Sequence, residues 1–264
     1  MKKLMIAGNW KLHMNVHQSS VLMQRLHERI RIHRDVEVVI APTMLSLQPL
    51  SVQLDRRKFR LASQNANHHD EGAFTGEVSF SMLRDIVHYG LVGHSDRRYK
   101  FNESLEDTRD KVAAAIRNGI TPILCVGETQ TEKLAGETDL VLHDQVTTAL
   151  QNVTADEVRN MVIAYEPVWA LSNGTNFRDV QTPTPDIIAK AANTIRRNIA
   201  DIYGQEVADS VRVLYGGSAH AANSSGLLAI KEIDGLLIGG ASMNYHEFSK
   251  MVDAAVKEAH SRKG

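Results

Sequence analysis

Short, nearly continuous apolar runs recur along the whole chain. They occupy residues 4–10, 36–42, 60–66, 89–95, 121–127, 161–167, 211–217 and 234–240. A strand of a parallel sheet is covered on both faces, so it reads as an unbroken apolar run rather than as an alternating one. The eight runs therefore predict eight parallel strands.

Amphipathic segments at helical spacing separate these runs. One apolar stripe contains Val21, Leu22, Leu26 and Ile30, and another contains Ile187, Ile188, Ala191, Ile195 and Ile199. The second stripe follows Thr184-Pro185-Asp186, a typical helix start. Thr154 and Glu157 have the spacing of a capping box, and we expect the last helix to run from about Tyr245 to Ala259.

The strand–helix alternation predicts the fold class. Eight repeats in 264 residues give about 33 residues per unit, and parallel strands need right-handed crossovers of this kind. We therefore expect an α/β protein with a single (β/α)8 barrel domain over residues 1–264. The alternative is an open doubly wound sheet. That fold usually carries G-x-G-x-x-G after its first strand, where this chain has Gly8-Asn9-Trp10-Lys11.

The amino-acid composition limits which binding partners and which cellular compartment we expect. The net charge of −1 gives no field for nucleic acid or an anionic membrane. The single cysteine, Cys125, excludes an internal disulfide and suits a reducing compartment. No apolar stretch approaches the roughly 20 residues of a membrane span. We expect a soluble cytoplasmic protein in which Cys125 is a buried thiol.

Polar and glycine residues follow the apolar runs. They are Asn9, Lys11, Gln64, Asn65, His94, Ser95, Glu128, Glu166, Gly216-Gly217-Ser218 and Gly239-Gly240. Active sites of (β/α)8 barrels form at the carboxyl ends of the strands. The sequence therefore predicts that these residues gather on one face of the barrel.

Seven stretches carry a close resemblance to a known family. They are Ala7-Gly8-Asn9-Trp10-Lys11, Gly72-Ala73-Phe74-Thr75-Gly76-Glu77, Gly93-His94-Ser95-Asp96-Arg97-Arg98, Cys125-Val126-Gly127-Glu128, Ala164-Tyr165-Glu166-Pro167-Val168-Trp169-Ala170, Tyr215-Gly216-Gly217-Ser218 and Gly239-Gly240-Ala241-Ser242. In these stretches and their order the chain resembles the triosephosphate isomerase family, and the resemblance spans nearly the whole sequence.

The resemblance implies an enzyme of glycolysis and gluconeogenesis that interconverts dihydroxyacetone phosphate and glyceraldehyde 3-phosphate without metal or cofactor. It implies Glu166 as the base, His94 as a neutral electrophile, Lys11 as the electrostatic stabiliser of an enediolate, and Asn9 beside it. This family is itself the standard example of a carboxylate base working with a neutral imidazole. Pro167 biases the backbone of Glu166 toward an extended form, which helps to aim its side chain.

The resemblance also implies the binding and supporting residues. Those expected to bind substrate and phosphate are Asn9, Lys11, Ser172, Ser218, Gly239 and Gly240. Those expected to support the site are Ser95, Asp96, Tyr215 and Gly217, and the loop that enters a second subunit of a homodimer carries Phe74, Thr75 and Gly76. A lid would begin at Pro167-Val168-Trp169 and be latched by Tyr215 and Ser218.

Two departures from the family pattern leave questions open. Asp96 stands where the family usually has glutamate, which shortens the reach toward Lys11 by one methylene, and Ser172-Asn173 alter the tip of the lid. One alternative function is a paralogous isomerase of a four-carbon ketose phosphate. Another is a non-catalytic sugar-phosphate binder, which should have lost Glu166 or His94. His68-His69-Asp70 lacks a third spaced ligand, so we expect no metal site there.

Overall fold

The structure is a computed structural model that describes residues 2–171 and 182–263. Its strands are β1 (Leu4–Asn9), β2 (Val36–Ala41), β3 (Phe59–Ser63), β4 (Tyr89–Val92), β5 (Thr121–Val126), β6 (Val162–Tyr165), β7 (Arg212–Tyr215) and β8 (Gly235–Ile238). Seven strands lie within their apolar runs and β3 begins one residue before its run, so the prediction of eight strands is confirmed.

The strands close into a barrel in chain order, β1 to β8. All neighbouring pairs are parallel. The closing pair aligns Met5 with Gly235 and Gly8 with Ile238. The barrel prediction is thereby confirmed, and the open-sheet alternative is wrong because β8 pairs with β1.

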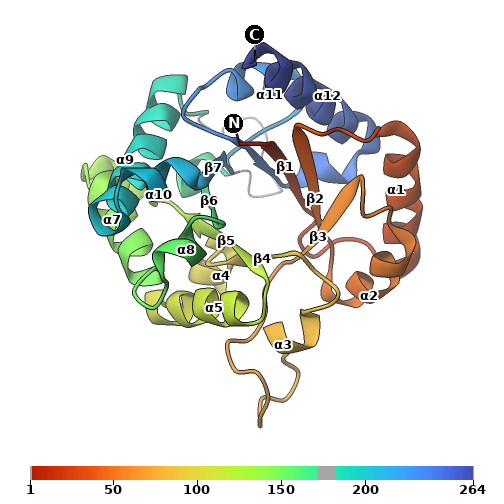
Figure 1. Cartoon of the computed structure of the whole chain (residues 1–264), viewed down its shortest axis with the longest axis horizontal. Helices are drawn as coiled ribbons and strands as arrows, with labels where there is room; N and C mark the ends of the chain where they lie inside the picture. Colours follow the sequence, from red (N-terminus) through yellow and green to blue (C-terminus); the bar gives the residue numbers. More distant parts are fainter. Residues whose placement is uncertain (1, 172–181, 264) are drawn as a thin grey trace.

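Helices surround the barrel as an outer ring (Figure 1). They are α1 (Val16–Arg29), α2 (Met44–Gln53), α3 (Phe80–Leu83), α4 (Ser95–Lys100), α5 (Leu105–Arg117), α6 (Gln130–Leu134), α7 (Thr138–Ala149), α8 (Ala155–Val158), α9 (Pro185–Tyr203), α10 (Gln205–Ser210), α11 (Ala221–Leu228) and α12 (Tyr245–Ser261). Two 3₁₀ turns, η1 (Val168–Ala170) and η2 (Gly240–Met243), follow β6 and β8.

The expected helix starts are confirmed. Helix α9 begins at Pro185 with Thr184 as its cap, and the Thr154–Glu157 capping box opens α8. The two stripes were drawn one residue too wide, because Val21 and Ile187 are both exposed. Successive side chains on a helix are rotated by about 100° around its axis. Val21 and Ile187 each precede a buried residue, so this rotation places them outside the face that α1 and α9 bury.

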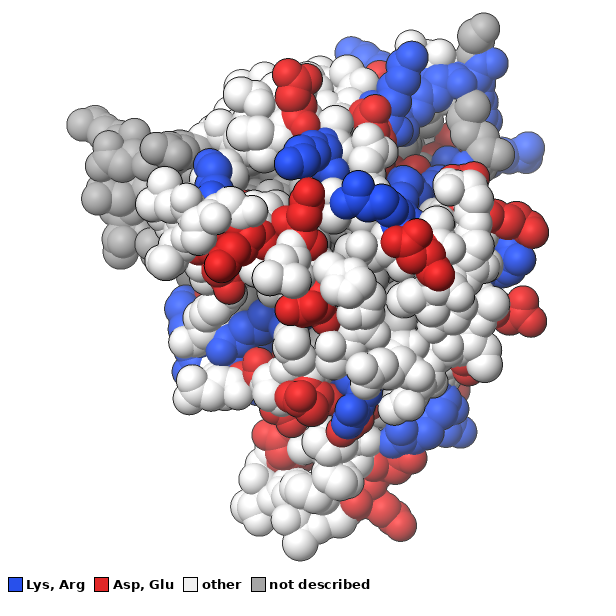
Figure 2. All heavy atoms as spheres, turned by 90° about the vertical axis from the view of Figure 1, so that its left-hand side faces the viewer, with Lys and Arg blue, Asp and Glu red and all other residues white. Residues whose placement is uncertain are grey.

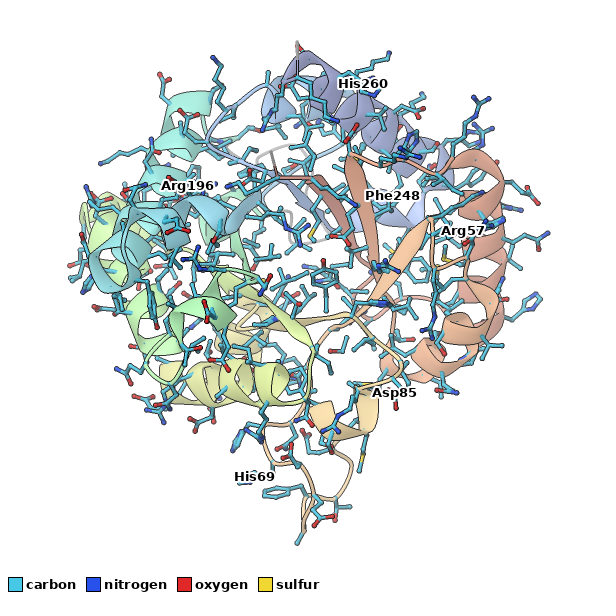
Figure 3. All side chains as sticks on the ribbon, in the orientation of Figure 1. Arg57, His69, Asp85, Arg196, Phe248 and His260 are labelled. Carbon is cyan, nitrogen blue, oxygen red and sulfur yellow. The ribbon has the colours of Figure 1, made fainter. Side chains whose placement is uncertain are left out.

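The apolar core has two layers. Inside the barrel lie side chains that alternate along the strands: Met5, Ala7, Val39, Ala41, Ala62, Tyr89, Leu91, Ile123, Cys125, Val162, Ala164, Leu214 and Leu237. The larger layer fills the space between strands and helices. Phe248 of α12 belongs to this layer (Figure 3), and Gly8 admits it because a Cβ at Gly8 would lie 3.2 Å from the Phe248 ring.

Charged side chains of both signs lie on the face shown in Figure 2. The face in Figure 2, turned by 90° from Figure 1, intersperses basic and acidic side chains without a large field of one sign, consistent with the net charge of −1. Within residues 2–171 and 182–263, the helices all fall short of the length and apolarity that a bilayer crossing requires.

An ion-pair network centred on the buried Asp234 joins Lys2, which precedes β1, to the neighbouring strands β7 and β8 and to α9. The Asp234 carboxylate accepts from Arg196 Nη2 at 2.6 Å and lies 3.1 Å from Lys2 Nζ. It also accepts from the backbone amide of Val213 at 2.9 Å. Figure 3 labels Arg196, which reaches from α9. Since the Asp234 side chain is only 9% exposed, its loss leaves two cations without their shared partner.

We expect Asp234→Ala to lower the free energy of unfolding by about 3 kcal/mol, because breaking a buried pair strands the remaining charges. Urea unfolding at fixed protein concentration measures this change. The matched control is Asp156→Ala, whose carboxylate is 98% exposed and 3.7 Å from Arg159. The control should change stability by less than about 0.5 kcal/mol. An equal effect in both variants would contradict the structural role of Asp234.

Candidate active site

Glu166 directly follows β6, and the backbone around it is closely packed. Its amide donates to Val126 O at 2.7 Å, and the next strand is tied in by Gly216 N donating to Tyr165 O at 2.8 Å. A Cβ on Gly127 would lie 2.0 Å from the Glu166 carbonyl oxygen, and one on Gly216 would lie 2.7 Å from Glu166 Cγ. Gly127 therefore makes room for the Glu166 backbone, and Gly216 makes room for the Glu166 side chain.

The Glu166 side chain is buried and points at the start of α4. Glu166 is only 2% exposed. Its Oε2 accepts from the backbone amide of Ser95 at 3.2 Å, and its Oε1 lies 3.2 Å from His94 Nε2. A carboxylate that accepts from the Ser95 amide, away from bulk water, thus lies beside the imidazole.

His94 caps α4, and this contact fixes its protonation pattern. The backbone amide of Asp96 donates to His94 Nδ1 at 3.0 Å. A ring nitrogen that accepts a hydrogen bond carries no proton, so the neutral ring must carry its proton on Nε2. That N–H then faces Glu166 Oε1. Protonation at Nδ1 would set two donors against each other at the positive end of α4.

Lys11 lies on a strained stretch of backbone after β1. Its φ of +50° falls in the left-handed region, which is uncommon for a residue other than glycine. Two side chains hold it there: Asn9 Oδ1 accepts from the Lys11 amide at 3.0 Å, and Gln64 Nε2 donates to the Lys11 carbonyl at 2.9 Å. The backbone strain is thus offset by hydrogen bonds from neighbouring strand ends.

Asp96 connects the lysine with the histidine. Its Oδ2 is 2.9 Å from Lys11 Nζ and 3.7 Å from His94 Nδ1. Burial alone would raise the pKa of Asp96, but hydrogen bonds from Lys100 and Lys11 lower this pKa to about 2. The shorter acid therefore reaches Lys11, which answers the question that the aspartate raised in the sequence, and it remains charged at neutral pH.

The glycine turn after β8 lies on the same side as Lys11. Gly239 precedes η2, and a Cβ on Gly239 would lie 3.9 Å from Lys11 Cε. The opening amides of a helical turn have no partner within that turn, so they are available to an anion. Ser218 is half-buried after β7, where Asn223 Nδ2 donates to its carbonyl oxygen at 3.2 Å.

The side chain of Tyr215 packs against Gly217 at the end of β7. A Cβ on Gly217 would lie 2.1 Å from the Tyr215 hydroxyl oxygen, so only glycine fits there. Tyr215 is fully buried, yet its hydroxyl has no hydrogen-bond partner among the described residues. A buried hydroxyl without a partner is costly, so this group is a candidate for contact with a ligand.

The residues after Glu166 are described only as far as Leu171. Here Trp169 Nε1 donates to Glu128 Oε1 at 2.8 Å, and Tyr165 Oη donates to the same carboxylate at 3.1 Å. Ser172, Asn173 and the expected lid tip lie outside the described residues. The predicted role of Ser172 in binding phosphate therefore stays a prediction.

Phe74, Thr75 and Gly76 lie apart from the other predicted residues. Their loop projects beyond the ring of helices beside α3 in Figure 1, and all three are exposed. His69, labelled near the tip in Figure 3, stacks on the Phe74 ring at a centroid distance of 4.3 Å. Within one chain, this loop does not join the cluster of Glu166, His94 and Lys11.

Sequence reasoning assigned no role to several residues that build the site. Gln64 was recognised only as a residue that ends a strand run, although it holds the Lys11 carbonyl. Arg98 donates from Nε to Gly93 O at 2.6 Å and from Nη2 to Cys125 O at 3.0 Å, and so joins the ends of β4 and β5. The only sequence signal for these contacts was that polar residues follow the apolar runs.

A metal site finds no support in the part of the chain that the structure describes. Those residues contain no group of three or more His, Cys, Asp or Glu side chains arranged to hold an ion. In the His68-His69-Asp70 stretch, Arg117 Nε donates to the Asp70 carboxylate at 3.0 Å. The cysteine is as expected, since Cys125 is buried, and burial raises the pKa of its thiol.

Comparison with known proteins gives a consistent result. The family model described as triosephosphate isomerase matches residues 4–255. The chain is similar to the triosephosphate isomerase of Carboxydothermus hydrogenoformans, with 39% identity over 97% of this chain and 100% of that protein. It is also similar to those of Ligilactobacillus salivarius, at 39% over 96% and 99%, and Pelobacter propionicus, at 40% over 96% and 99%.

Proposed function

The chain belongs to the triosephosphate isomerase family, and from this premise we propose that Glu166, His94 and Lys11 carry out the interconversion of triose phosphates. Dihydroxyacetone phosphate and glyceraldehyde 3-phosphate are isomers. Their carbonyl groups are on adjacent carbons, and their interconversion moves a proton from one of these carbons to the other. The observation that carries the proposal is the pairing of a buried carboxylate, Glu166, with the Nε2–H of a neutral histidine at 3.2 Å.

Glu166 acts as the base. Its carboxylate removes the proton from the carbon next to the carbonyl and returns it to the former carbonyl carbon. The proton of the substrate hydroxyl passes to the former carbonyl oxygen, so the other oxygen becomes the new carbonyl. In the resting site the carboxylate accepts from Ser95 N and lies 3.2 Å from His94 Nε2, so substrate must enter between the carboxylate and the imidazole. A base held in a buried pocket keeps the proton from bulk water during the transfer.

His94 and Lys11 stabilise the charge that develops on oxygen. The Nε2–H of His94 donates to the carbonyl oxygen as it becomes an enediolate, and a neutral imidazole is matched to a weakly acidic enediol. Lys11 supplies the positive charge, and Asn9 fixes its backbone through the 3.0 Å hydrogen bond. Donors already aimed at a developing charge cost no reorganisation during the reaction.

The phosphate binds at the ends of β7 and β8. Backbone amides of Gly239, Gly240 and Ser218 form this part of the site, with Lys11 Cε beside Gly239. Glycines let the backbone approach an anion closely, and barrel enzymes often bind phosphate after their last two strands. Tyr215 contributes as a latch its hydroxyl, which has no hydrogen-bond partner among residues 2–171 and 182–263.

The alternative functions lack a supporting observation. A non-catalytic binder should have lost the base or the electrophile, whereas Glu166 and His94 are present and in contact. A four-carbon ketose phosphate isomerase was suggested only by the lid tip, which lies outside the described residues. The relatives reported above carry the name triosephosphate isomerase.

We expect Glu166→Gln to reduce kcat/KM for glyceraldehyde 3-phosphate by about 10²–10⁴-fold in a coupled assay, because the amide cannot accept the proton. The wild-type value should approach the diffusional ceiling of about 10⁸ M⁻¹s⁻¹. The matched control is Glu206→Gln, an exposed glutamate 2.9 Å from Arg159, which should leave the rate unchanged. A Glu166→Gln variant with more than a tenth of wild-type activity would refute this role.

The active form is a homodimer in the cytoplasm. Large apolar side chains follow β1, β2 and β3, with Leu12 at 93%, Leu45 at 73% and Phe74 at 43% exposure. These strands are neighbours in the barrel, so the three residues mark one side of it. Apolar groups gathered on one side favour burial in an interface. The loop of Phe74, Thr75 and Gly76 would enter the second subunit beside its Asn9 and Lys11.

We expect sedimentation equilibrium to give twice the 29.3 kDa mass of the chain. Phe74→Asp should shift the protein toward monomer, because it places a charge where the loop is buried against the second subunit. Met82→Asp, at a position 60% exposed beside the loop, serves as a comparison that shows how far the interface extends. A wild-type mass of one chain at all concentrations would contradict the dimer.

A further inference from the structure

The Asp96 carboxylate lies between two lysines, and only one of them belongs to the proposed mechanism. Its Oδ2 is 2.9 Å from Lys11 Nζ, while its Oδ1 is 2.7 Å from Lys100 Nζ. Lys100 lies one helical turn after Asp96, at the end of α4. An acid four residues before a lysine is the favourable orientation for an ion pair on a helix.

Residue 96 is unusually placed for a half-exposed ion pair. Its backbone amide fixes the tautomer of His94, and its carboxylate lies 3.7 Å from the same ring. Hydrogen bonds from both lysines outweigh burial in lowering the pKa of Asp96 to about 2, so the carboxylate is charged whenever the enzyme works. A fixed negative charge therefore lies beside the group that must stabilise an enediolate.

This arrangement gives Lys11 two competing anions. When substrate binds, Lys11 faces both the Asp96 carboxylate and the negative charge on the substrate. If Lys11 alone offset Asp96, the local charge of the pair would be zero and little field would remain for the substrate. With Lys100 on the other carboxylate oxygen, the three groups carry a net charge of +1.

We propose that Lys100 is a positioning residue. It holds the Asp96 carboxylate and offsets its negative charge, so that the positive charge of Lys11 remains available to attract the substrate. The proposal rests on the function proposed above, because it assigns Lys100 an effect on the same reaction. Lys100 does not touch the reacting atoms and acts through Asp96. Its side chain is 70% exposed, so the effect is moderated by solvent and by salt.

The test compares the kinetics of wild type, Lys100→Met and Lys100→Arg with glyceraldehyde 3-phosphate at low ionic strength. Lys100→Met should lower kcat by about three- to tenfold, because screened charges of this kind have modest effects. KM should change by less than about twofold, since the charge on the reacting oxygen is larger in the enediolate than in the bound carbonyl. Lys100→Arg should restore kcat to within about twofold.

Salt and a matched lysine separate this role from a general effect of charge. Added salt at about 0.5 M should bring wild type and Lys100→Met together, because it screens partly exposed charges. Lys190→Met removes a lysine that is 75% exposed and 3.8 Å from Asp139, and it should leave kcat unchanged. Equal urea midpoints for both methionine variants would exclude a merely structural cause.

The outcomes distinguish this inference from the proposed function. An active wild type whose kcat is unaffected by Lys100→Met, or equally affected by Lys190→Met, overturns the role of Lys100 and leaves the isomerase in place. A wild type that does not interconvert the two triose phosphates overturns both proposals. A loss in Lys100→Met that Lys100→Arg does not rescue also counts against charge compensation.

Discussion

The hydrogen bond from the Asp96 amide to His94 Nδ1 is the contact on which the proposed chemistry depends. It leaves the imidazole with its proton on Nε2, so the ring can donate toward Glu166 and toward a substrate oxygen. The same residue directs its carboxylate to Lys11. One short helical start after β4 thus orients the electrophile and the cation, and any change in its backbone would disturb both.

The barrel makes this contact possible by bringing residues far apart in sequence to one rim. Glu166 follows β6, His94 follows β4 and Lys11 follows β1, and closure of β8 on β1 sets all three strand ends around one opening. The glycines at 127 and 216 allow neighbouring backbone to approach Glu166. The ion pairs of Asp234 lie away from this rim and hold the strands together, which separates stability from catalysis in the molecule.

Much of this arrangement is predictable from the order of residues. Unbroken apolar runs identify parallel strands because burial on both faces leaves no room for polar alternation, and the position of Glu166 after such a run places it on the rim. The sequence pattern does not give the distances between side chains on different strand ends. The reach of Asp96 to Lys11, the strained backbone of Lys11 and the part played by Gln64 depend on how three strand ends meet. Helix faces were also blurred by one residue, because apolar side chains such as Val21 tolerate partial exposure.

The measurement that tests this account most directly is ¹⁵N NMR of the protein labelled in its histidine rings, with His94 assigned by comparison with His94→Gln. At neutral pH the account predicts a protonated Nε2, with a one-bond coupling to hydrogen, and an unprotonated Nδ1 for His94. An Nδ1–H tautomer, or an imidazolium with both nitrogens protonated, would contradict the account, because neither can accept a hydrogen bond from the Asp96 amide at Nδ1.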